Sequence, residues 1–314
     1  MERAGKREDA LKAYEQVVQR AGKFENDPWP EKGGAQLVRF LRPRLEAALK
    51  ADDDFELINL FHRNGPFADR LYAGTELLLK VAEAHRRLGF PIESARLFQS
   101  LIRDSKAEAF HEVALMGLGD SYLEQKDMRA ARAVFERYRL QFPVGRFAGQ
   151  ALIGILTSFE GEGNTSGLVK LGKQWLIHNP RHPDRALVQL KVADALRQAK
   201  RDAEAAPLYE SVLKAGMDLS ALDRLRYADV LARLIRQEPA LALYKQALIA
   251  GLEPEQEAWA QFQIVQLARG VKREEFARSG LRALNENSDS LVRRMAAVLQ
   301  TELPEPTSAA GGKK

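Results

Sequence analysis

The sequence predicts an all-α fold, a solenoid of antiparallel helix pairs without a β-sheet. First, a small residue followed four positions later by an aromatic or bulky one recurs at intervals of 37, 37, 37, 35 and 37 residues. Second, apolar residues between these points recur at i, i+3 and i+4, the spacing of one helix face. Third, no segment alternates apolar and polar residues as a half-buried strand does. A fixed period of this length indicates stacked repeats, each packed against its neighbours.

The composition excludes several classes of protein. The chain has 314 residues, of which 45% are hydrophobic and 29% charged, as in folded soluble proteins rather than disordered ones. The longest uncharged run, residues 147–159, is shorter than the ~20 residues that span a bilayer, so we expect no membrane insertion by this chain. Without cysteine, the chain has no disulfide, thiolate zinc site or cysteine nucleophile.

The clearest copy of the repeat lies at residues 115–143. Its pattern consists of Leu115, Leu118, Gly119 and Tyr122, then Ala131, Phe135 and Tyr138, and finally Pro143. Gly119 and Ala131 are small, so two helices can approach closely there, and Pro143 ends the second helix. In residue types and spacing this segment resembles the tetratricopeptide repeat. The resemblance implies a right-handed superhelix in which the first helix of each pair lines a concave face.

Six such repeats are predicted over residues 72–288. The small-residue position is filled in turn by Ser94, Ala131, Leu168, Ala205, Ala240 and Ala277, of which Leu168 gives the poorest match. A second small residue stands twelve positions earlier, on the first helix, at Ala82, Gly119, Ala193 and Ala228. The aromatic residues of this pattern are expected in the core, among them Phe135, Tyr138, Tyr209 and Tyr244.

The repeat pattern weakens toward the N-terminus. Residues 1–21 match the second helix of a repeat, so the array begins with a half unit or the chain is cut from a longer protein. Residues 22–71 are expected to form a loop over 22–34 and then a divergent helix pair near 36–50 and 54–63, with Ile58 in the small-residue position.

At the other end, residues 289–302 are expected to form a capping helix, because Asn287 to Ser290 is rich in residues that start helices. Its arginines suit the solvent-facing end of a repeat array. Residues 303–314 contain proline, glycine and a final Lys-Lys pair, and we expect a disordered tail.

Three local patterns approach chemical sites but lack a required residue. His178 and His182 have the spacing of helical metal ligands, yet Pro180 interrupts that segment. An acidic run from Asp52 lacks the glycine and glutamate of a calcium loop. The glycine-rich run 161–167 lacks the preceding strand and the Lys-Ser/Thr ending of a phosphate loop. We therefore expect turns and helix caps, no metal or other cofactor, and a protein that is not an enzyme.

The resemblance implies that the first helices hold a peptide or helix of a partner protein in their groove. Matching the C-terminal repeats to the family pattern assigns to this groove Lys191, Asp194, Arg197, Arg226, Asp229, Arg233, Trp259, Phe262, Gln266 and Arg269. Guanidinium groups suit carboxylates, so we expect an acidic segment. The alternative is that these charges pair with one another along the helix faces. Trp259 and Phe262 either bind the partner or pack against the preceding repeat.

The expected function is a protein–protein interaction scaffold. The alternative is a helical-repeat module that binds nucleic acid or another anionic surface, but the net charge of +5 is spread over 48 basic and 43 acidic residues. Self-association through an uncapped end also remains open. The segment from Gly119 to Ala151 is similar to bacterial envelope proteins of the family. The chain is expected in the cytoplasm if Met1 is native, and in the periplasm if an upstream signal or anchor was removed.

Overall fold

The computed structural model describes residues 9–10, 12–14, 16, 29–63, 75–270, 274–287 and 289–301. Every regular element among them is helical, and no strand occurs there. The expected tail 303–314 and most of the expected half repeat 1–21 lie outside the described residues. The chain divides into two compact units, Met1–Glu162 and Gly163–Lys314, and each is described by itself.

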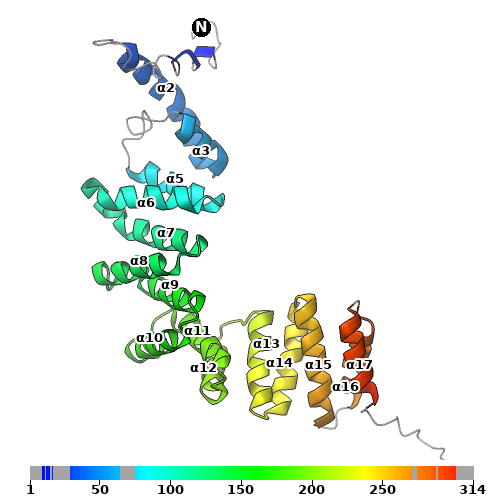
Figure 1. Cartoon of the computed structure of the whole chain (residues 1–314). Coiled ribbons are helices and arrows are strands. Elements are labelled where there is room, and N and C mark those ends of the chain that lie inside the picture. The colour runs from blue at the N-terminus through cyan, green and yellow to red at the C-terminus, as the bar shows by residue number, and fades with distance from the viewer. Residues whose placement is uncertain are drawn as a thin grey trace, which may run out of the picture. The chain divides into compact units, whose positions relative to one another are not determined.

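Unit 1 consists of helices that each pack against the next one along the chain (Figure 1). They are α2 (Trp29–Lys50), α3 (Asp54–Arg63), α5 (Thr75–Arg87), α6 (Pro91–Arg103), the 3-10 helix η2 (Ser105–Phe110), α7 (His111–Glu124), α8 (Met128–Gln141) and α9 (Ala148–Gly161). The first helices α5, α7 and α9 also contact one another in succession. Helix α2 begins at Trp29 rather than near Gln36, so part of the expected loop is helical. Pro30 fits there because the N–H groups of the first helical turn have no acceptor within the helix, so proline, which lacks an N–H, loses no hydrogen bond.

Unit 2 has the same organisation. It contains α10 (Thr165–His178), α11 (Arg185–Gln198), α12 (Asp202–Lys214), α13 (Ala221–Arg233), α14 (Gln237–Ala250), α15 (Pro254–Gly270), α16 (Glu274–Asn285) and α17 (Ser290–Thr301). Helices α11, α13, α15 and α17 contact one another in succession, and the stack from α13 to α17 is visible in Figure 1. The predicted class, an all-α solenoid of helix pairs, is confirmed. None of the described helices has the length and apolar character needed to cross a membrane.

The repeat register is visible in the turns that join the two helices of each pair. In the six such turns from α2–α3 to α13–α14, a residue has a left-handed backbone; these residues are Asp52, Gly89, Lys126, Gly163, Lys200 and Ile235. Such a residue ends one helix and allows the chain to reverse. The intervals are 37 residues, except for 35 before Ile235. The pair α2–α3 therefore follows the same register as the later pairs.

This register corrects one assignment. The small-residue position lies five residues after each left-handed turn residue, as at Lys126 and Ala131, so after Asp52 it falls on Leu57 rather than on Ile58. Leu57 is 3% exposed, whereas Ile58 is half-buried. The expected aromatic core is present, since Phe135, Tyr138, Tyr209 and Tyr244 are all buried.

A histidine pair joins α3 to α5. The Nε2 atoms of His62 and His85 are 2.9 Å apart, and Nδ1 of His85 lies 2.8 Å from the carbonyl oxygen of Val81. A carbonyl only accepts, so neutral His85 donates at Nδ1 and accepts at Nε2 from His62. Burial lowers the pKa of His85, which is 1% exposed; the Val81 carbonyl and Glu93 oppose this shift, and His62 adds to it.

We expect unit 1 to lose stability as the pH falls below about 6.5. The pKa of His85 is lower in the folded chain, so the unfolded chain binds the proton more readily. The contribution of His85 is complete above the unfolded value of ~6.5 and declines below it, by at most ~1.4 kcal/mol per pH unit. The pH dependence of thermal unfolding should flatten in His85→Gln and persist in His178→Gln, a change at an exposed histidine. An equal dependence in wild type and His85→Gln would contradict this role.

Candidate partner-binding face

The residues assigned to the groove lie on three first helices that contact one another in succession. Lys191, Asp194 and Arg197 are on α11, while Arg226, Asp229 and Arg233 are on α13, and Trp259, Phe262, Gln266 and Arg269 are on α15. The side chain of Arg269 lies outside the described part of the structure. We call the others together the α11–α13–α15 face.

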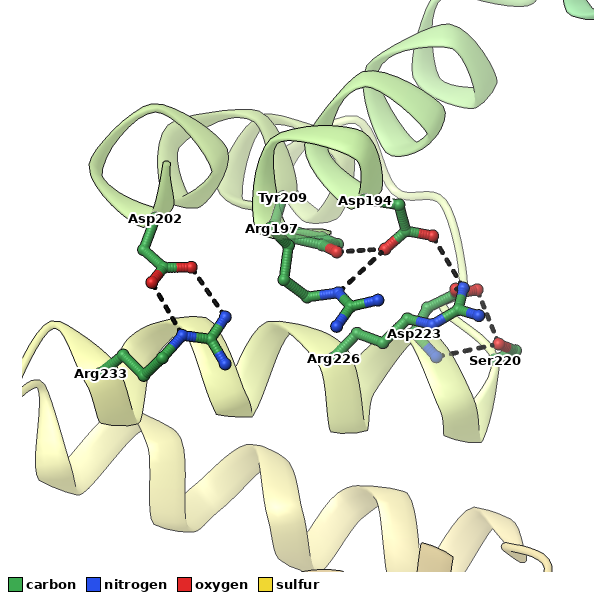
Figure 2. A network of polar contacts seen from close by, with 8 residues as sticks. All are labelled: Asp194, Arg197, Asp202, Tyr209, Ser220, Asp223, Arg226 and Arg233. Atoms are coloured by element: carbon green, nitrogen blue, oxygen red, sulfur yellow. Dashed lines mark hydrogen bonds and ion pairs between the residues drawn. The ribbon is translucent and has the colours of Figure 1, made fainter. Parts of the chain in front are cut away.

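Asp194 is the centre of a polar network between α11, α12 and α13 (Figure 2). One carboxylate oxygen accepts a hydrogen bond from the hydroxyl of Tyr209, and the other accepts from Nη1 of Arg226 at 2.7 Å. The same Arg226 nitrogen lies 3.4 Å from Asp223. Burial raises the pKa of Asp194, opposed by Tyr209 and Arg226. Burial and the neighbouring Asp194 likewise raise the pKa of the Tyr209 hydroxyl.

Arg233 is held by a second aspartate (Figure 2). Its Nε and Nη2 atoms donate to the two oxygens of Asp202, both at 2.7 Å. This bidentate pair raises the pKa of Arg233. Arg226 and Arg233 thus bind aspartates of the preceding helix pair. At these two positions the structure has internal charge pairing, the alternative that the sequence left open.

Arg197 differs from these two arginines. Its Nε lies 3.8 Å from Asp194, which is too far for a hydrogen bond. This nitrogen is buried and has no hydrogen-bond partner among the residues that the structure describes. The side chain is 21% exposed, and its terminal nitrogens make no hydrogen bond with the described residues, so these nitrogens can still donate to a bound molecule.

Trp259 contacts the preceding repeat and also reaches solvent. Its indole N–H donates to Asp229 at 3.0 Å, and Asp229 also accepts from the Tyr244 hydroxyl at 2.6 Å. The indole stacks on Phe262, with ring centroids 6.0 Å apart, and 44% of Trp259 remains exposed. Phe262 packs against the core of α15, α16 and α17. Trp259 thus contacts the preceding repeat and keeps an exposed surface, whereas Phe262 packs within its own repeat and against α17.

The remaining two residues of the face are polar. Gln266 is exposed and makes no hydrogen bond within the described chain. Lys191 is half-buried and already has an interaction.

Asp120 occupies in unit 1 the register position of Asp194 and Asp229, but it is not among the residues that the sequence assigned to the binding site. In its repeat, Phe135 stands where unit 2 has Tyr209 and Tyr244, so no hydroxyl reaches the carboxylate. Asp120 has no hydrogen-bond donor among the described residues, and burial raises its pKa, opposed by Arg86. The phenylalanine at position 135, where the repeats of unit 2 have tyrosine, was the feature of the sequence that could have indicated this difference.

The three local motifs have structural roles. His178 contacts the Gln174 carbonyl through Nδ1, and His182 accepts from the backbone N–H of Asp184. In the acidic run, Asp54 binds Arg87 and the backbone of Glu56 is capped by Asp53. Asn164 accepts from the Gly167 N–H and thereby starts α10. No group of three or more potential metal ligands occurs in the described ranges.

Comparisons with known proteins agree with this architecture. Residues 113–143 match the family model of the tetratricopeptide repeat. No curated protein matches the chain. A solved structure, the C-terminal part of a TPR repeat-containing protein from Cytophaga hutchinsonii, aligns with a TM-score of 0.62 at 11% identity, over 81% of this chain and 98% of that one. A tetratricopeptide repeat protein from Parabacteroides merdae aligns with a TM-score of 0.46 at 16% identity, over 79% of this chain and 89% of that one.

The first of these likenesses shows the fold, and the family match places one repeat on α7 and α8. Five other helix pairs share its turn register, and the first helices contact one another in succession from α5 to α9 and from α11 to α15. The chain therefore has the fold of tetratricopeptide repeat proteins, and its residues 113–143 match the model of that repeat.

Proposed function

We propose that this chain is a non-enzymatic scaffold that binds a segment of a partner protein on the α11–α13–α15 face. The observation that carries the proposal is the way the chain holds this face in place. Asp194 and Asp229 each receive a tyrosine hydroxyl and a donor from the next first helix. Side chains that are ordered before binding lose less entropy when a partner arrives.

Two residues of the face suit a partner directly. Trp259 is a large aromatic side chain that is fixed by a hydrogen bond and still 44% exposed, as the anchors of protein interfaces often are. The terminal nitrogens of Arg197, which make no hydrogen bond with the described residues, offer donors that suit a carboxylate or a backbone carbonyl of the bound segment. An acidic partner would thus meet Arg197, while Arg226 and Arg233 hold the face together.

Binding of nucleic acid is not favoured by any feature of this face. Phosphate binding requires basic groups that are free to replace counterions. Here Asp194 and Asp202 already engage Arg226 and Arg233.

The proposal is tested by affinity capture from source-cell extract with quantitative mass spectrometry. Three chains are compared: wild type, the double variant Arg197→Gln/Trp259→Ala, and Ile249→Ser. Ile249 lies on the second helix α14 and is largely exposed, so its change is a matched control away from the first-helix face. We expect proteins captured by wild type and by Ile249→Ser to be lost from the double variant.

Circular dichroism should show that all three chains are equally helical. A capture that is equal for wild type and the double variant would contradict binding on this face. A capture lost equally from the double variant and from Ile249→Ser would contradict it as well.

A further inference from the structure

Unit 1 contains a cavity of about 660 Å³ between α2, α3 and α5. It is lined by Arg42, Glu46, Ala48, Leu49, Asp52, Asp54, Leu57, Glu76, Leu77, Lys80 and Arg87. Its volume is in the range of ~300–1,000 Å³ that is usual for ligand pockets. None of its residues belongs to the α11–α13–α15 face, and none lies in the repeat that matches the family model.

Apolar side chains from all three helices contribute to the cavity wall. Ala48 and Leu57 are buried, and Leu49 and Leu77 are half-buried. All four belong to the hydrophobic core of this part of the unit or pack against it. The cavity therefore offers a fixed apolar surface to an aliphatic group.

The charged residues of the cavity leave a negative excess. Arg87 binds Asp54 through two hydrogen bonds of 2.5 and 2.7 Å, and Lys80 binds Glu83 at 3.2 Å, so both cations are compensated. The other four charged residues make no salt bridge or hydrogen bond through their side chains with the described residues; they are Arg42, Glu46, Asp52 and Glu76. One free cation thus stands against three free carboxylates.

We propose that this cavity docks a basic segment of a partner protein in which an arginine or lysine stands beside an apolar residue. The aliphatic stem and the apolar neighbour would lie on the leucines, and the cationic head would reach the free carboxylates. Charge complementarity selects this occupant over an acidic one.

The chain has no cysteine, which allows a local test. An environment-sensitive dye is attached to Lys50→Cys, at the exposed end of α2 beside the cavity residues Leu49 and Asp52. The full chain is titrated with a short peptide of alternating leucine and arginine, and separately with the same peptide carrying citrulline in place of arginine. Citrulline keeps the shape of arginine and removes its charge. Calorimetry with the unlabelled chain checks that the dye does not create the site.

We expect the arginine peptide to bind with saturation and at least ~tenfold more tightly than the citrulline peptide, because hydrogen bonds to charged groups are the stronger ones. The double variant Glu46→Gln/Glu76→Gln should bind the arginine peptide at least ~tenfold more weakly than wild type does and should keep its affinity for the citrulline peptide. Glu136→Gln removes an exposed glutamate of α8 that has no ion pair with the described residues, and should leave both affinities unchanged.

The proposal is overturned if the arginine peptide does not bind, or if the two peptides bind equally. It is also overturned if Glu46→Gln/Glu76→Gln binds like wild type, or if Glu136→Gln loses as much as the double variant does. All glutamines replace exposed glutamates of similar shape, so circular dichroism should show folded chains throughout. Any of these results leaves the test of the α11–α13–α15 face untouched, because that test uses variants on α11 and α15.

Discussion

Replacement of Gly119 by alanine is expected to destabilise unit 1 by about 2 kcal/mol. A Cβ atom on Gly119 would stand 2.4 Å from Cε1 of Phe135, and one on Gly154 would stand 2.4 Å from its Cε2. The buried ring thus lies between two glycines and cannot move away from a methyl group. In a helix interior, alanine is about 1 kcal/mol more favourable than glycine. Overpacking of a core costs about 1–3 kcal/mol, and we expect a cost at the upper end of this range because the clash is so close.

Hydrogen exchange read by mass spectrometry can measure this loss in the amides of α7, α8 and α9. Gly161→Ala is the matched control, since the three atoms nearest to its new Cβ all belong to the flexible Met128 side chain, and we expect it to change stability by less than about 1 kcal/mol. In a Phe135→Leu background, Gly119→Ala should be less harmful because the ring is gone. If Gly119→Ala and Gly161→Ala behave alike, the packing explanation is wrong.

The close contact at Gly119 also shows how much of the helix packing can be predicted from the sequence alone. Gly119, Ala131 and Phe135 formed a recognisable pattern, so the contact between α7 and α8 was predictable. The role of Gly154 was not, because it belongs to the repeat with the poorest match. The left-handed turn residues escaped notice for a related reason. Besides glycine they include lysine and isoleucine, whose identities do not indicate such a backbone.

The helix that carries the arginines of the candidate face was predictable, but the identity of their partners was not. The family pattern placed Arg226 and Arg233 on the correct helix, since helix periodicity fixes which residues share a face. Their aspartate partners come from the preceding helix pair, about one repeat away in sequence. Which charged residues form ion pairs across a separation of one repeat depends on how the helix pairs stack. The spacing of residues within one helix does not determine that stacking.

The second large effect concerns Asp194. Replacement by alanine is expected to destabilise unit 2 by about 3 kcal/mol, since breaking a buried charge pair typically costs about 3–5 kcal/mol. The side chain of Asp194 is 13% exposed, so removing it leaves the Tyr209 hydroxyl without an acceptor and Arg226 with Asp223 alone. Arg226 retains partial access to water, which places the effect at the low end of that range. Asp194→Asn keeps an oxygen for Tyr209 and should lose less.

Urea unfolding followed by circular dichroism tests this effect, with Arg197→Gln as control. Arg197 lies beside the same carboxylate but makes no hydrogen bond to it, so its change should alter stability by less than about 1 kcal/mol. Tyr209→Phe should weaken unit 2 by about 1–3 kcal/mol through the loss of one hydrogen bond to a charged group. Its effect should largely vanish when Asp194 is already alanine, because both changes break the same bond. Additive losses in the double variant, or a loss in Arg197→Gln equal to that in Asp194→Ala, would mean that Asp194 does not hold these helices together through Tyr209 and Arg226.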